Sequence, residues 1–150
     1  IALYKDFKSM VGIGSEHSTL NNFLIETLNK FDLSIAQIPE EFYQFDAFSR
    51  SDQLMFASAG IPSILVLEGP DNKHLTRDEV ISGMIDYNIY HYHKPSDDLN
   101  NIVIDYEAAQ QHAEVLKDLI ISISNSENKP EWNEGSPYIN ERLRSVAEKR

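Results

Sequence analysis

Apolar residues recur at the spacing of an α-helix in two long stretches of the chain, residues 18–31 and residues 105–126. Ser18 precedes the first stretch and is expected to be its N-cap. The second stretch predicts the strongest helix, with one face carrying Ala109, His112, Leu116, Leu119, Ile120 and Ile123. Both helices therefore have an apolar side to bury against a common core.

Two further helices are predicted between these stretches. Thr76 and Glu79 have the spacing of a capping box, which predicts a helix over residues 76–90. Gly83 lies inside this helix and lowers its intrinsic stability. Residues 51–60 predict a short helix that ends at a glycine.

Three short apolar runs predict β-strands. Residues 9–14 end in glycines, residues 33–38 alternate until Pro39 stops them, and residues 61–69 form the most apolar run. The first and third runs are so apolar that we expect cover on both faces. Residues 39–49 are acidic and aromatic without a period, and they predict a loop.

The alternation of strands and helices predicts an α/β layered fold. Residues 1–125 are expected to form the main unit, and residues 126–150 a polar tail or docked arm that ends in a short helix. About three strands are few for an independent α/β domain, and the chain begins at Ile1 rather than Met. We therefore expect it to be a portion of a longer protein, with any signal peptide already removed.

The composition excludes several classes of protein. A net charge of −11 argues against nucleic-acid binding and against anionic membrane surfaces, because both need clustered Lys and Arg. No apolar run reaches the roughly 20 residues of a membrane span. The absence of cysteine excludes disulfides and thiolate ligation of a metal.

Candidate chemistry is concentrated in residues 88–99, NIYHYHKPSDDL, which hold two of the five histidines of the chain. His93 is followed by Pro95 and Asp97. A neutral imidazole is a good zinc ligand, and a nearby carboxylate can orient it. The spacing alone leaves a metal site, a titrating surface and a polar loop open.

Two motifs in order and at a characteristic separation carry a resemblance to a known family. The first has the pattern S-D-x-x-x-F-x-x-x-G-I-P and consists of Ser51, Asp52, Phe56, Gly60, Ile61 and Pro62. The second has the pattern Y-H-x-x-x-D and consists of Tyr92, His93 and Asp97. Residues 1–125 thereby resemble the C-terminal half of the co-catalytic zinc aminopeptidases, a family that includes bacterial leucyl-type aminopeptidases, glutaminyl cyclases and glutamate carboxypeptidases.

The resemblance implies a fold and a metal centre. The fold would be the C-terminal part of a mixed-sheet zinc-exopeptidase sandwich with helices on both faces. Two zinc ions would activate a water for peptide hydrolysis, with His93 as the last metal ligand. The other ligands and the general base would precede Ile1. Gln53 stands where many relatives carry His, and Gln variants occur in the bacterial branch of the family. Lys94 stands where Thr is common, and it indicates the subfamily.

The resemblance also implies roles for neighbouring residues. Tyr92 would donate a hydrogen bond to the developing oxyanion, or it is a packed aromatic with its hydroxyl in water. Asp52 would orient His93 or join an active-site network, or it is a plain N-cap. Asp97 is a candidate to support the metal ligand, against a turn-forming aspartate. Arg50 would face a substrate carboxylate or pair with an acid.

We therefore expect the parent protein to be a zinc aminopeptidase that acts on peptides in the periplasm or outside the cell. The isolated chain is expected to be inactive and to hold few or no zinc ions, because it carries one expected ligand. Its expected partners are an N-terminal half or a second copy. The alternatives are an inert fragment or interaction module of the same fold, and a glutaminyl cyclase or carboxypeptidase-type relative.

Overall fold

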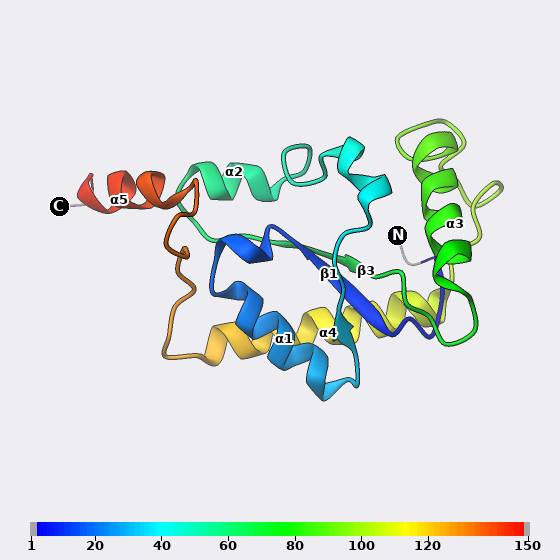
Figure 1. The fold of residues 1–150 in the computed structure, drawn as a ribbon, viewed down its shortest axis with the longest axis horizontal. Helices are drawn as coiled ribbons and strands as arrows, with labels where there is room; N and C mark the ends of the chain where they lie inside the picture. Colours follow the sequence, from blue (N-terminus) through cyan, green and yellow to red (C-terminus); the bar gives the residue numbers. More distant parts are fainter. Residues whose placement is uncertain (1–2, 149–150) are drawn as a thin grey trace.

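The computed structural model describes residues 3–148 and shows an α/β fold around a small mixed sheet (Figure 1). The three strands are β1 (Ser9–Ile13), β2 (Ser34–Ile35) and β3 (Leu65–Glu68), in the order β2-β1-β3. β1 pairs with β2 in parallel and with β3 antiparallel. The expectation of an α/β fold with about three strands is confirmed within the described residues.

Helices and short 3-10 turns connect the strands. Their bounds are η1 Ser15–His17, α1 Leu20–Lys30, η2 Glu40–Phe45, α2 Gln53–Ser58, α3 Arg77–Tyr90, α4 Tyr106–Asn125 and α5 Ile139–Ala147. None of the helices within residues 3–148 has the length and apolar character needed to cross a membrane.

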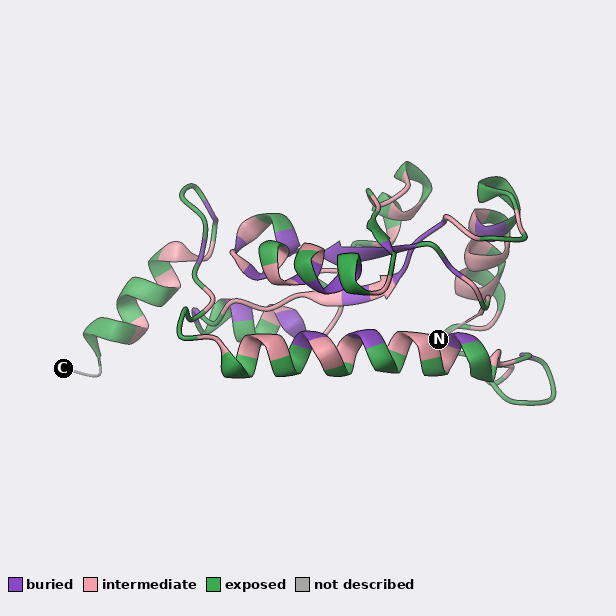
Figure 2. Ribbon diagram, turned by 90° about the horizontal axis from the view of Figure 1, so that it is seen from below, coloured by how far each residue is buried: buried purple, intermediate pink, exposed green. Residues whose placement is uncertain are grey.

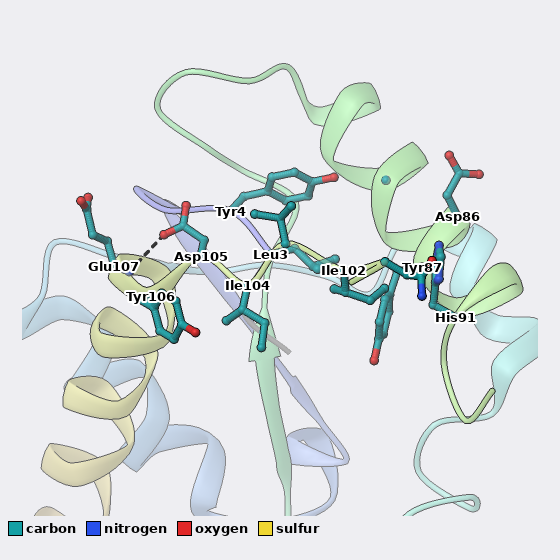
Figure 3. Close-up of a pocket in the computed structure, with 13 residues that line it drawn as sticks. Leu3, Tyr4, Asp86, Tyr87, His91, Ile102, Ile104, Asp105, Tyr106 and Glu107 are labelled. Carbon is teal, nitrogen blue, oxygen red and sulfur yellow. Dashed lines mark hydrogen bonds between the residues drawn. The ribbon is translucent and has the colours of Figure 1, made fainter. Parts of the chain in front are cut away.

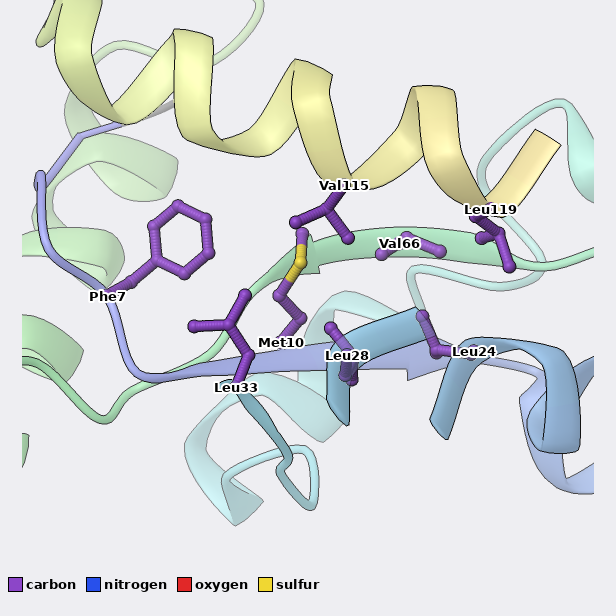
Figure 4. Close-up of a cluster of buried hydrophobic side chains, with 8 residues drawn as sticks. All are labelled: Phe7, Met10, Leu24, Leu28, Leu33, Val66, Val115 and Leu119. Carbon is purple, nitrogen blue, oxygen red and sulfur yellow. The ribbon is translucent and has the colours of Figure 1, made fainter. Parts of the chain in front are cut away.

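The sheet lies between two groups of helices. Figure 1 shows α1 and α4 on one side of the strands, and α2 and η2 on the other. In Figure 2, α4 runs along the sheet with its buried residues turned toward it. The core between the sheet and the helices α1 and α4 contains Phe7, Met10, Leu24, Leu28, Leu33, Val66, Val115 and Leu119 (Figure 4). Burial of these side chains removes apolar area from water, which is the main force that holds the layers together.

Two of the helix predictions are wrong in detail. The N-cap of α1 is Thr19, because Ser18 is fully buried and forms an isolated bridge with Trp132. The buried face of α4 carries Ala108, Val115 and Leu119, whereas Ile120 is 62% exposed. The apolar spacing in α4 is compatible with more than one phase, and packing on α1 and the sheet selects this one.

The strand boundaries also differ from the prediction. β2 has only two residues, and both are exposed. It ends at Ile35, four residues before Pro39, so the proline is not the residue that stops the strand. The predicted loop over residues 39–49 contains the 3-10 helix η2. β1 is buried throughout, but β3 alternates between half-buried and buried positions, so only β1 has the expected cover on both faces.

The start of α3 is as predicted. The Thr76 hydroxyl accepts a hydrogen bond from the Glu79 amide, and the Glu79 carboxylate accepts one from the Thr76 amide. Gly83 has a packing role, because a Cβ built there would lie 1.7 Å from the hydroxyl oxygen of Tyr4. The glycine thus admits the N-terminal segment close to α3.

The C-terminal arm packs on the rest of the molecule. Trp132 is 8% exposed, and its indole N–H donates to the Gly60 carbonyl at 3.2 Å. The Asn133 amide donates to the His17 carbonyl at 2.9 Å. A Cβ on Gly60 would lie 2.6 Å from backbone atoms of Arg142 in α5. The C-terminal arm therefore packs against the end of α2.

Candidate functional site

His93 lies in a pair of successive turns that follow α3. The Lys94 amide donates to the His91 carbonyl at 2.9 Å, and the Asp97 amide donates to the Lys94 carbonyl at 2.9 Å. His93 has a φ of 59°, in the left-handed region that non-glycine residues seldom adopt. Such a conformation persists only when neighbouring contacts hold it, and it is frequent at functional sites.

Hydrogen bonds to the end of α3 hold these turns. The Tyr87 carbonyl accepts from the amides of His91 and Tyr92, both at 2.9 Å. The Ser96 hydroxyl donates to the Tyr90 carbonyl at 2.9 Å. The last carbonyls of a helix lack partners within the helix, and here the turn supplies some of them.

The aromatic rings of the turn pack against one another. The rings of Tyr92 and His93 stack with centroids 3.9 Å apart, and the ring of Tyr87 lies 6.1 Å from that of Tyr92. The Tyr87 hydroxyl donates to the carboxylate of Asp97, at 3.2 and 3.3 Å from its two oxygens. Burial, and then the bond to Asp97, raise the pKa of Tyr87 to about 12. Its hydroxyl therefore stays protonated, and able to donate, further into the alkaline range than that of an ordinary tyrosine.

The other predicted residues lie on a separate segment. Asp52 occupies the N-cap position of α2 without a side-chain capping bond, and Arg50 is exposed. Within residues 3–148, neither forms a hydrogen bond or ion pair with Tyr92, His93 or Asp97. Figure 1 shows the segment before α2 and the turn after α3 on the side of the sheet away from α1 and α4. The roles of Asp52 and Arg50 stay predictions.

Gln53, one of the two residues that depart from the resembled family, has a structural role. It is 7% exposed, and its side-chain amide donates to the carbonyls of Ala47 and Phe48, both at 3.0 Å. The backbone carbonyl of Gln53 accepts a hydrogen bond from the Ser63 hydroxyl at 2.7 Å. Gln53 thus fixes the segment that carries Arg50 and Asp52.

Comparison with known protein families gives one match. The model of peptidase family M28 matches residues 5–120, a range that includes both motifs and extends from before β1 into α4. The chain belongs to peptidase family M28. Comparisons with curated proteins and with solved structures gave no match.

Membership of the M28 family confirms the resemblance to the zinc exopeptidases and implies metallopeptidase activity, typically with zinc. In the described range 3–148, no three or more His, Cys, Asp or Glu side chains are grouped as a metal site. The exposed His93 ring has no hydrogen-bond partner in that range, so its nitrogens are accessible. His93 thus fits as a single ligand, and the described residues do not complete a metal centre.

A cleft of about 580 Å³ adjoins the turn (Figure 3). Tyr87 and His91 lie on its α3 side, and Ile104, Tyr106 and Glu107 on the side where α4 begins. Sequence reasoning missed Tyr87, which lines this cleft and donates a hydrogen bond to Asp97. The available signal was its position four residues before His91, because residues at this spacing share a helix face.

Proposed function

We propose that this chain carries one zinc ligand, His93, of an M28 aminopeptidase that uses two zinc ions. The observation that supports this most directly is the exposed imidazole of His93, which has no hydrogen-bond partner among residues 3–148 and lies inside the region that the family model matches. The left-handed backbone of His93, with a φ of 59°, holds this ring in the exposed turn.

The residues of the turn have complementary roles in this proposal. When bound, the zinc ions polarise the substrate carbonyl and lower the pKa of a water. His93 offers an imidazole nitrogen, and the stacked ring of Tyr92 restricts its rotation. The Tyr92 hydroxyl is proposed to donate a hydrogen bond to the oxyanion of the substrate.

The remaining zinc ligands and the general base are proposed to lie outside these 150 residues. A catalytic zinc site needs three protein ligands and an open position, and His93 provides one of them. We accordingly propose that the three-stranded sheet is part of a larger mixed sheet between helices, and that the isolated chain does not hydrolyse peptides.

Substrates that differ at one end test the reaction class in the protein at its natural length. We expect hydrolysis of an aminoacyl-nitroanilide, loss of this activity with a chelator, and recovery with zinc. The N-acetylated substrate should be inert, because an aminopeptidase requires a free α-amino group. Cleavage only at a free C-terminus, or cyclisation of an N-terminal glutamine without hydrolysis, would assign the protein to another branch of the family.

A further inference from the structure

One residue of α3 holds the His93 turn at both ends. The backbone carbonyl of Tyr87 accepts hydrogen bonds from the amides of His91 and Tyr92, each at 2.9 Å. These two residues begin the turn. The hydroxyl of Tyr87 donates to the carboxylate of Asp97, which ends it. His93 lies inside the loop that these bonds close.

Three other contacts join the end of α3, or the residue that follows it, to this loop, and one of them is between His91 Nδ1 and the Ser96 carbonyl at 3.3 Å. The Ser96 hydroxyl reaches the Tyr90 carbonyl, and the Lys94 ammonium group reaches the Ile89 carbonyl. Both use backbone carbonyls at the end of α3, where the helix dipole also favours a cation. Within residues 3–148, Tyr87 is the α3 residue whose side chain forms a hydrogen bond with the turn.

We propose that Tyr87 is the positioning residue for the metal ligand His93, and that it acts through its hydrogen bond to Asp97. This inference rests on the proposed function. Because His93 has a left-handed backbone, its turn needs contacts that exclude other conformations. The bond between Tyr87 and Asp97 supplies one such contact from a rigid helix, and it leaves the His93 imidazole accessible to a metal.

Groups that orient a metal ligand without touching the metal typically change metal affinity 10–100-fold. In the protein at its natural length, Tyr87→Phe removes the hydroxyl and keeps the ring. We expect zinc to bind roughly 10-fold more weakly, measured by competition with a chromogenic chelator. Activity should recover in excess zinc with an unchanged KM. If Tyr87 only stabilised the fold, excess zinc would not restore the activity that Tyr87→Phe loses.

Tyr90→Phe is the matched control. Tyr90 lies on the same helix, its side chain is 62% exposed, and its hydroxyl has no hydrogen-bond partner among residues 3–148. We expect this variant to bind zinc like the wild type. If Tyr87→Phe fails to fold, Asp97→Ala removes the same hydrogen bond from an exposed position and should show the same zinc-dependent loss.

The double variant tests whether Tyr87 and Asp97 act together. Because both changes remove one interaction, the zinc affinity of Tyr87→Phe with Asp97→Ala should be no weaker than that of either single variant. Wild-type zinc affinity in Tyr87→Phe, while His93→Ala loses zinc, would overturn this inference and leave the proposed function intact. Unchanged zinc affinity in His93→Ala would overturn both.

Discussion

At the scale of single residues, the backbone conformation of His93 favours glycine, whereas its proposed role requires a histidine side chain. Its φ of 59° suits glycine better than histidine, whereas its imidazole is the group that a metal needs. The sequence predicts His93, Tyr92 and Asp97 as a group because they are close along the chain. Tyr87 escapes such reasoning, because its partner Asp97 is ten residues away and only the turn brings the two together.

Two substitutions of His93 separate the zinc-binding role of its imidazole from the energetic cost of its positive φ. Both His93→Ala and His93→Gly lack the imidazole, so neither should bind zinc through this position. Glycine adopts positive φ without a Cβ clash, so His93→Gly should be about 1 kcal/mol more stable than His93→Ala in urea-induced unfolding. Equal stability of the two variants would contradict the left-handed conformation.

The raised pKa of Tyr87 predicts a dependence of stability on alkaline pH. Its folded-state pKa of about 12 exceeds its ordinary value of 10.0, so the folded state favours the protonated hydroxyl. The stabilisation is fully present below pH 10.0 and is lost as the pH rises toward about 12. The unfolding free energy of wild type should therefore fall more steeply than that of Tyr87→Phe across this range. Parallel profiles would contradict the burial of the Tyr87 hydroxyl together with its bond to Asp97.

At the scale of elements, predictions from local chemistry hold better than predictions that depend on packing. The capping box of Thr76 and Glu79 defines the start of α3 within four residues, and it forms as predicted. The length of β2 and the buried face of α4 depend on Lys8, Met10 and the core, which lie far along the chain. No local period encodes these contacts, and those two predictions needed correction.

Removal of the α3 cap tests the local contribution. Thr76→Ala deletes the hydroxyl that accepts from the Glu79 amide and should lower the unfolding free energy by about 1 kcal/mol. Thr76→Ser keeps a hydroxyl at the same position and should retain most of that energy. A loss in Thr76→Ser as large as in Thr76→Ala would assign the effect to the methyl group instead of the cap.

At the scale of the whole molecule, the C-terminal arm and α2 form one packed unit. The sequence predicts an arm, but its packing against Gly60 depends on the indole of Trp132 and on the backbone of α5. The strand order also cannot be read from the sequence, because the runs that form β1, β2 and β3 have similar apolar patterns. The M28 motifs predict which segments carry chemistry, and the fold determines how far apart they lie.

Two glycines with similar backbone conformations test the contact between Gly60 and the C-terminal arm. Gly60 has a φ of 78° and Gly135 has a φ of 82°, but a Cβ on Gly135 would meet nothing within 4 Å. An alanine at either position adopts the same unfavourable positive φ. The unfolding free energy of Gly60→Ala should therefore be about 1–3 kcal/mol lower than that of Gly135→Ala, because the Cβ at position 60 clashes with Arg142. Proteolysis of the arm should also be faster in Gly60→Ala. Equal destabilisation would place α5 away from Gly60.

The central claim is that His93 binds the metal of this M28 peptidase. The most direct test is the zinc content of the protein at its natural length, measured by elemental mass spectrometry after gel filtration in limiting zinc. His93→Ala should lose bound zinc relative to wild type. His74→Ala should retain it, because His74 is an exposed histidine paired with Asp6 at 2.9 Å. Wild-type zinc content in His93→Ala would contradict the assignment of His93 as a metal ligand.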